Sequence, residues 1–198
     1  YVFVLIASSV GAYFKGGKQA VSVWVSDRYT RAAPGGTGAA KCGGNYAASL
    51  VAQSEAMKHG CDQVLFLDAA EHRWIEELGG MNIFFVFDDG SISTPPLGGT
   101  ILPGITRDSI LTLARLEGLS VSEKPYSFDA LRKDAASGKL REAFACGTAA
   151  VVSAIGDVKT SAGQITIGDA TAGPVTRSLK SKLVGIQRGE MPDAHGWI

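Results

Sequence analysis

The feature that most constrains the fold is a predicted hairpin near the middle of the chain. Two apolar, β-rich runs at 82–87 and 92–94 flank Asp88-Asp89-Gly90, and a short loop that contains Asp-Gly joins adjacent antiparallel strands. Other predicted strands are interspersed with predicted helices along the chain. A purely parallel sheet cannot contain such a hairpin, so the sequence predicts an α+β or mixed α/β fold with mixed sheets and surrounding helices.

Periodicity and turn residues place the remaining elements. Further strands are predicted at 1–7, 21–25, 63–67, 121–125, 142–145, 150–154 and 164–167, and helices at 46–59, 106–117, after Ser127 and at 174–187. The first of these helices has a periodic face made of Ala47, Leu50, Val51, Ser54 and Met57. Gly16-Gly17-Lys18 is typical of a flexible loop, so we expect a domain linker near 12–20.

Length, charge and cysteine usage narrow the function classes. A chain of 198 residues can bury the core of one domain, or of one domain and a small appendage. Lys+Arg and Asp+Glu both number 19, so no net field favours nucleic acid or an anionic membrane, and small-molecule chemistry is the better expectation. The apolar run at residues 1–6 is far shorter than the roughly 20 residues that a membrane helix requires.

The cysteines and histidines indicate neither a disulfide framework nor a metal site. The cysteines are odd in number and widely spaced, which predicts reduced thiols and a cytoplasmic location; they are Cys42, Cys61 and Cys146. The three histidines share no spacing typical of metal ligands with one another or with the cysteines. We therefore predict no metal.

A glycine-rich stretch at 35–46 contains a single lysine, Lys41. Glycine permits left-handed and closely approaching backbone, so this lysine can be presented into a confined, poorly solvated place. There the amine loses part of its preference for the charged form and can act as a nucleophile or base. A surface turn with a solvated lysine is the alternative interpretation, and residues elsewhere in the chain must decide between the two.

Three later segments supply candidate partners for Lys41. Glu77 precedes Gly79-Gly80 in a predicted turn between strands, where the backbone can approach a ligand closely. The segment 101–107 places free N–H groups at a helix start, which favours a phosphate. Gly147-Thr148-Ala149 offers a hydroxyl and amides to a second anionic group. Each segment alone is also compatible with an ordinary turn, helix start or strand start.

Together these segments resemble the large domain of the branched-chain amino-acid aminotransferases, which are pyridoxal-phosphate enzymes of the D-amino-acid-aminotransferase-like fold (fold type IV). The resemblance covers essentially the whole chain through ordered motifs. These motifs are Gly11-Ala12-Tyr13-Phe14, Lys41-Cys42-Gly43-Gly44-Asn45-Tyr46, Glu77-Leu78-Gly79-Gly80-Met81-Asn82, Leu102-Pro103-Gly104-Ile105-Thr106-Arg107, Gly147-Thr148-Ala149 and Ile186-Gln187-Arg188-Gly189.

The resemblance implies a domain division. Residues 1–11 are expected to be the last strand of a small N-terminal domain that is otherwise largely absent from the sequence. Residues 12–20 are then the interdomain loop, and 21–198 the large domain that binds pyridoxal 5′-phosphate. Because the family's small domain brings an arginine to the phosphate, we expect this chain to hold only part of the active site.

The resemblance also implies roles around the cofactor ring. Lys41 is expected to form a Schiff base with the cofactor and then to move the proton between substrate and cofactor carbons. Glu77 is expected to face the pyridine nitrogen and keep it protonated. Tyr46 is expected to hydrogen-bond the phenolic oxygen, and Leu102 to pack on the ring.

Four further residues are expected to bind anionic groups. By the same resemblance, the amides of Ile105 and Thr106 and the Thr148 hydroxyl hold the cofactor phosphate. The turn at Thr148 and Ala149 offers amides to the substrate carboxylate. No cysteine follows this turn in the Cys-x-x-Cys pattern of the mitochondrial-type members, so thiol regulation of that kind is not implied.

The implied reaction is transfer of an amino group between leucine, isoleucine or valine and 2-oxoglutarate. The expected partners are amino acids and 2-oxo acids, and the expected assembly is a homodimer or a larger homo-oligomer. Two alternatives keep the cofactor and change the reaction, to a D-amino-acid transaminase or an aminodeoxychorismate lyase. A third is a domain fragment without activity that lacks half of the active site.

Overall fold

Nine strands form one mixed sheet in the computed structural model, which describes residues 2–9 and 19–198. In the described part of the chain they are β1 (Val21–Ser26), β2 (Gln63–Leu67), β3 (Ile75–Leu78), β4 (Asn82–Phe87), β5 (Ile92–Thr94), β6 (Val121–Glu123), β7 (Leu140–Gly147), β8 (Val151–Thr160) and β9 (Gly163–Thr166). Their order is β3-β2-β1-β8-β7-β4-β5-β6, with β9 paired to β8. The pairs β1–β2, β1–β8 and β5–β6 are parallel and the others antiparallel, which confirms the predicted mixed sheet.

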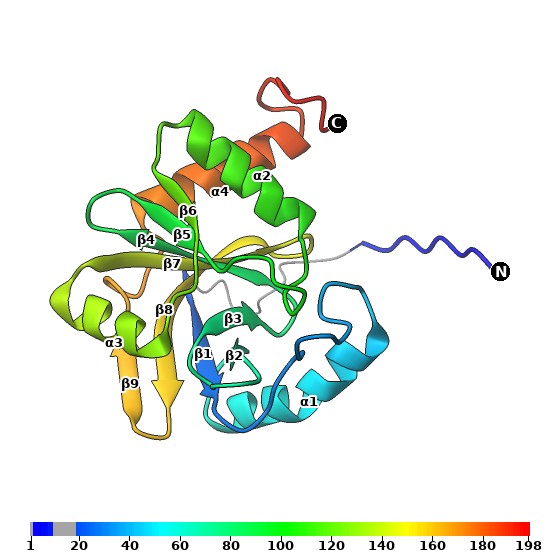
Figure 1. The fold of residues 1–198 in the computed structure, drawn as a ribbon. Coiled ribbons are helices and arrows are strands. Elements are labelled where there is room, and N and C mark those ends of the chain that lie inside the picture. The colour runs from blue at the N-terminus through cyan, green and yellow to red at the C-terminus, as the bar shows by residue number, and fades with distance from the viewer. Residues whose placement is uncertain (1, 10–18) are drawn as a thin grey trace.

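Helices cover this sheet on more than one side (Figure 1). They are α1 (Gly43–Lys58), α2 (Ile105–Leu116), α3 (Phe128–Ser137) and α4 (Pro174–Gln187). The helices α2 and α4 contact each other and lie over β7 and β8, whereas α1 packs on β1 and β2. The chain therefore surrounds one sheet with helices, as predicted.

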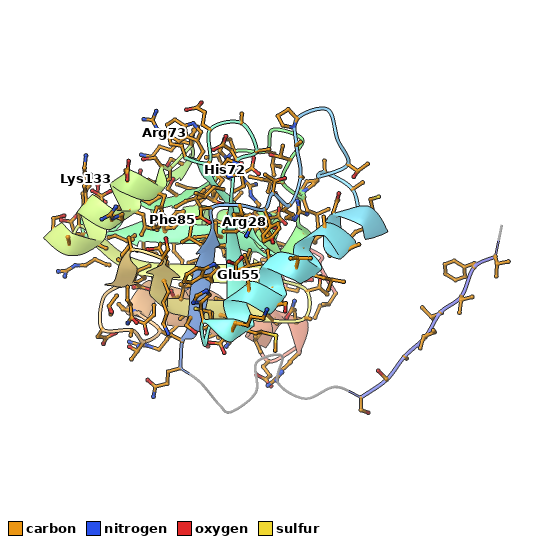
Figure 2. The ribbon with its side chains drawn as sticks, turned by 90° about the horizontal axis from the view of Figure 1, so that it is seen from below. Arg28, Glu55, His72, Arg73, Phe85 and Lys133 are labelled. Carbon is orange, nitrogen blue, oxygen red and sulfur yellow. The ribbon has the colours of Figure 1, made fainter. Side chains whose placement is uncertain are left out.

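Alternation along β4 shows how the sheet divides the core. Ile83, Phe85 and Phe87 belong to one buried cluster with residues of β1, β2 and α3. Phe84 and Val86 point the other way, into a cluster with α2 and α4. This is the period-two pattern of a strand buried on both faces. Figure 2 shows Phe85 in the middle of the molecule, and each such side chain contributes about 1.5–3 kcal/mol by burial.

The predicted hairpin is confirmed. Phe85 pairs with Ser93 in the antiparallel ladder of β4 and β5. In the connecting turn, Gly90 has a φ of 78°, a backbone conformation that glycine adopts without a steric penalty. The carboxylate of Asp89 accepts the Ser91 N–H at 2.9 Å, as aspartate does in many turns.

The predicted first strand is not formed. Residues 2–9 lie in no helix or strand, are exposed, and extend away from the rest of the molecule (Figures 1 and 2). A strand needs a neighbour for its backbone hydrogen bonds, and none of the described strands runs beside this segment. The motif at 11–14 and most of the expected linker lie outside the described residues. The division into 1–11, 12–20 and 21–198 stays a prediction.

Two further local predictions are wrong. Glu76 and Glu77 lie in strand β3, which pairs with β2, rather than in a turn. The helix predicted at 46–59 begins earlier, at Gly43, and buries the opposite face to the one expected from periodicity. Its buried residues are small or polar, and they are Asn45, Ser49, Ala52 and Ala56. The periodic face that includes Leu50 and Met57 is exposed, because contact with β1 and β2 is made by the smaller side chains.

Candidate active site

A cavity of about 400 Å³ lies where four segments of the chain meet. The segments are the loop before α1, the β3–β4 connection, the entry to α2 and the β7–β8 turn. The lining residues are Lys41, Glu77, Gly80, Met81, Asn82, Leu102, Pro103, Gly104, Ile105, Thr106, Cys146, Gly147, Thr148, Ala149 and Ala150. All of the predicted site residues except Tyr46 are among them, so the fold brings together residues that are far apart in sequence.

The cavity has a buried floor and an exposed rim. Glu77 and Thr106 are buried, whereas Lys41, Thr148 and Ala149 are exposed. Of the two interpretations of Lys41, its exposure favours the solvated one in this structure, although the lysine lines the open side of the cavity. A buried floor and an open rim suit a ligand that enters from solvent and meets Lys41 at the rim.

Tyr46 lies beside the lysine rather than in the cavity lining. The Lys41 Nζ is 5.7 Å from the centre of the Tyr46 ring. The Tyr46 hydroxyl is buried and has no hydrogen-bond partner. Buried hydroxyls are normally paired, so this one is available to an oxygen of a bound molecule.

Asn45 holds the loop that carries Lys41. Its Nδ2 donates to the carbonyls of Thr37 and Ala40 at 2.7 and 3.0 Å, and its Oδ1 accepts the Thr37 hydroxyl at 2.7 Å. The Asn45 side chain thus binds both ends of the segment that leads into Lys41. The glycine-rich loop is fixed by hydrogen bonds, although it contains few side chains that can pack.

Glu77 is the charged group at the floor of the cavity. It is 1% exposed, its Oε2 accepts the Leu102 N–H at 2.8 Å, and its Oε1 lies 3.1 Å from Arg31 Nη2. Burial raises the pKa of Glu77 to about 7, while the Arg31 guanidinium, the Leu102 N–H and Lys41 oppose the rise. The carboxylate is therefore poised to gain or lose a proton near neutral pH.

The entry to α2 forms a second wall with unpaired donors. The first N–H groups of a helix have no acceptor within it, and no side chain caps α2. Asn82 Nδ2 donates to the Leu102 carbonyl at 2.9 Å, which fixes the segment before the helix. A Cβ at Gly104 would collide with Asn82 Oδ1, so a larger residue would displace the side chain that holds Leu102. The arrangement can bind an anion at Ile105 and Thr106.

The β7–β8 turn closes the cavity with strained backbone. Thr148 and Ala149 lie at its exposed tip. Val151, which begins β8, has a φ of 54°, in the left-handed region that a β-branched residue rarely adopts. Strain of this kind costs about 1–3 kcal/mol and is concentrated at functional sites.

Sequence reasoning missed several residues of the site, above all Arg31. It is 4% exposed and lies ten positions before Lys41, in a segment without periodicity. Its pairing with Glu77 depends on the packing of two distant segments, so the only sequence signal is an arginine shortly before the glycine-rich stretch. Asn82 and Cys146 also line the cavity, although the sequence motifs assigned them no role in the predicted site.

The chain matches the model of a known protein family. The Amino-transferase class IV family model matches residues 5–158. The chain belongs to the class IV aminotransferases. It is 55% identical over its whole length to the branched-chain-amino-acid aminotransferase of Mycolicibacterium smegmatis, and 56% identical to the enzyme of that name from Mycobacterium tuberculosis. It covers 55% of each, so the chain spans about half the length of these relatives.

Solved structures of class IV aminotransferases share the fold. The branched-chain amino acid aminotransferase from Escherichia coli matches 90% of this chain and 56% of its own, with a TM-score of 0.77 and 37% identity. A second branched-chain amino acid aminotransferase, solved with pyridoxamine 5′-phosphate, matches 95% of this chain and 58% of its own, with a TM-score of 0.79 and 32% identity. The predicted fold type is therefore confirmed.

Neither a membrane-spanning helix nor a cluster of metal-ligating side chains occurs among the described residues. No helix in this part of the chain has the length and apolar character required to cross a bilayer. Within 2–9 and 19–198, no group of three or more His, Cys, Asp or Glu side chains is arranged to hold a metal. The three cysteines are free thiols.

Proposed function

We propose that this chain is the large, cofactor-binding part of a branched-chain-amino-acid aminotransferase. The observation that carries the proposal is the position of Lys41, Glu77 and the uncapped start of α2 around one cavity. High identity to relatives of that name supports the reaction. In the proposed reaction an amino group moves between leucine, isoleucine or valine and 2-oxoglutarate.

The residues present fit pyridoxal 5′-phosphate. The cavity offers an amine at its rim, a buried carboxylate at its floor and helix-start amides at one wall. The orphaned Tyr46 hydroxyl belongs to a ring whose centre lies 5.7 Å from the Lys41 amine, and it would pair with the phenolic oxygen of the cofactor. Among the relatives of known structure, one was solved with pyridoxamine 5′-phosphate and another with N-(5′-phosphopyridoxyl)-L-glutamate, which supports the same cofactor here.

Lys41 and Glu77 would carry the chemistry. When bound, the cofactor supplies a carbonyl carbon for amines and a ring that accepts electrons. Lys41 would hold that carbon covalently and, once released, would take a proton at Nζ and return it to a neighbouring carbon. Glu77 in its ionised form would hold a proton on the ring nitrogen, because a buried carboxylate favours positive charge beside it.

The remaining site residues would bind and orient. The N–H groups of Ile105 and Thr106 and the Thr148 hydroxyl would hold the phosphate, while Leu102 would pack against the ring. The amides at Thr148 and Ala149 would receive the substrate carboxylate. Thr148 and Ala149 are exposed at the tip of the β7–β8 turn, where a substrate can reach them from solvent.

The assembly, the compartment and the domain division belong to the same proposal. A homodimer or a larger symmetric homo-oligomer, in the cytoplasm, is what we expect of the complete enzyme. Sedimentation of the complete protein measures the assembly. A fully active monomer would contradict it.

A panel of amino donors tests the reaction. The complete protein, supplied with pyridoxal 5′-phosphate and 2-oxoglutarate, should consume L-leucine, L-isoleucine and L-valine and form glutamate. Efficient use of D-alanine in their place would favour the D-amino-acid transaminase, and release of pyruvate from aminodeoxychorismate would favour the lyase. An absence of all three reactions in the complete protein would overturn the assignment, and transamination by this chain alone would exclude a fragment without activity.

A further inference from the structure

We propose that Arg31 is a positioning residue of this site, which favours the ionised form of Glu77 and joins the lysine loop to the segment that carries Leu102. This inference deepens the proposed function and rests on it wherever turnover is concerned. The buried guanidinium of Arg31 makes contacts with three different segments of the chain. Arg31 Nη1 donates to the Thr100 carbonyl at 2.7 Å, and Nη2 lies 3.5 Å from the Gly38 carbonyl and 3.1 Å from Glu77 Oε1.

These contacts form a closed ring of interactions. From Glu77, the ring continues through the Leu102 N–H at 2.8 Å, and Leu102 lies two residues after Thr100. The Thr100 carbonyl returns to Arg31. Gly38 packs so closely on Thr100 that a Cβ at this glycine would collide with the Thr100 backbone. A displacement of Arg31 therefore moves the lysine loop, the Leu102 segment and the Glu77 carboxylate together.

The positive charge of Arg31 also affects the protonation of Glu77. The side chains of Arg31 and Glu77 are each 2% exposed, and a buried carboxylate without a cation would take up a proton. The other charged or titratable groups near Glu77 are Lys41 from the loop before α1, Glu76 on the same strand and Cys146 on β7. Glu76 opposes ionisation, and Lys41 is a cation that the proposed chemistry engages in a covalent bond. Arg31 is the cation that is always charged.

Glu76 is attached to the same ring of interactions. Its Oε1 accepts the Thr100 hydroxyl at 2.5 Å. Arg31 also lowers the pKa of Glu76, so two adjacent carboxylates share one guanidinium. Arg31 has to compensate both, which makes its replacement by a neutral residue more costly for Glu77 than the loss of a single contact.

The variants Arg31→Gln and Arg31→Lys separate the charge of Arg31 from its position. Arg107→Gln is the matched control, because Arg107 is buried and ion-paired but does not touch Glu77. Infrared titration of this chain without cofactor follows the carboxyl band that Glu77→Gln removes. Arg31→Gln should raise the pH of half-ionisation by about 1–3 units, while Arg31→Lys and Arg107→Gln should leave it near the wild-type value. An unchanged midpoint in Arg31→Gln overturns the proposal.

Turnover gives the second readout, in the complete enzyme with pyridoxal 5′-phosphate. The acidic limb of kcat/KM should move to higher pH in Arg31→Gln and return in Arg31→Lys. In Arg31→Lys, kcat should still fall about tenfold, because one ammonium cannot replace the forked contacts. If Arg31→Gln does not fold, an unchanged kcat in Arg31→Lys overturns the positioning role. A moved infrared midpoint with no transamination by the wild type would overturn the proposed function and support the ionising role of Arg31.

Discussion

Two buried arginines near the cavity are each paired with a glutamate, and the two pairs differ in how far the carboxylate reaches solvent. Arg31 and Glu77 are both 2% exposed at their side chains, whereas Arg107 is 4% and its partner Glu123 37% exposed. Burial raises the pKa of Glu77 to about 7, but the hydrogen bond from Arg107 holds the pKa of Glu123 below its ordinary value. An Arg–Glu pair thus contains a carboxyl group that titrates near neutral pH in one place. In the other place, the pair contains an ionised carboxylate that stabilises the structure.

The segments around the two pairs also differ in how they are packed. On the Arg31 side, the lysine loop and α1 are held by polar contacts of Asn45 and by small side chains. On the Arg107 side, α2 buries a continuous apolar face against the sheet and α4. The site therefore combines a rigid wall for an anion with a lysine loop whose position depends on a few hydrogen bonds.

The largest predicted effect distinguishes the two glutamates by activity. Glu77→Gln should keep the shape of the site but lower kcat by about two or more powers of ten, because a neutral amide cannot balance the positive charge of a protonated ring nitrogen. Glu123→Gln should leave turnover close to the wild-type value, at some cost in stability. The measurement is steady-state transamination in the complete enzyme, with thermal unfolding to check that both variants fold. Near-normal turnover of Glu77→Gln would refute its role.

The second prediction distinguishes the two helices by stability. Ile110 in α2 is fully buried, so Ile110→Ala should lower the free energy of unfolding by about 2–5 kcal/mol. Leu50 in α1 is 67% exposed, so Leu50→Ala should change it by less than about 0.5 kcal/mol. Urea unfolding of this chain measures both. Equal losses would show that the exposed face of α1 is covered in solution.

The third prediction concerns pH. Because the pKa of Glu77 is raised from 4.5 to about 7, the folded state binds more protons than the unfolded state between these values. The contribution of Glu77 to stability is fully present below about pH 4.5 and is lost as the pH rises to about 7, a change of about 3 kcal/mol. Glu77→Gln should flatten this part of the stability profile. A profile unchanged by that substitution would contradict the burial argument.

The smallest predicted effect tests the polar attachment of the lysine loop. Asn45→Ala removes the hydrogen bonds to the Thr37 and Ala40 carbonyls and should lower the free energy of unfolding by about 1–2 kcal/mol. The exposed Ser54 on the same helix provides the control, because Ser54→Ala should have little effect. Hydrogen exchange across 35–42 should also become faster in Asn45→Ala. Unchanged exchange there would show that other contacts fix the loop.

Much of the fold follows from local patterns in the sequence. The hairpin, most of the strands and the helix at 174–187 were predictable because apolar periodicity and turn residues agree there. Strand β3 was not, because Glu76-Glu77 beside two glycines is typical of a turn, and only pairing with β2 makes it a strand. The buried face of α1 was misassigned because small and polar residues make its contacts.

The site was predictable through ordered motifs rather than through single residues. Lys41, Glu77 and the entry to α2 meet at one cavity, as the resemblance implied. Arg31 was missed because its role arises only from tertiary contacts with Gly38, Glu77 and Thr100. The exposure of Lys41 could likewise not be predicted from its neighbours in the sequence, because exposure depends on which segments pack beside it.

Covalent capture of the cofactor shows whether Lys41 is the residue to which it attaches. Pyridoxal 5′-phosphate is added to this chain and to the complete protein, borohydride is applied, and the modified peptide is mapped by mass spectrometry. We predict a reduced cofactor on Lys41 in the wild type, its loss in Lys41→Ala, and its retention in Lys58→Ala, which removes an exposed lysine from the last turn of α1. A specific label that persists in Lys41→Ala, or that maps to another lysine in the wild type, would contradict the account.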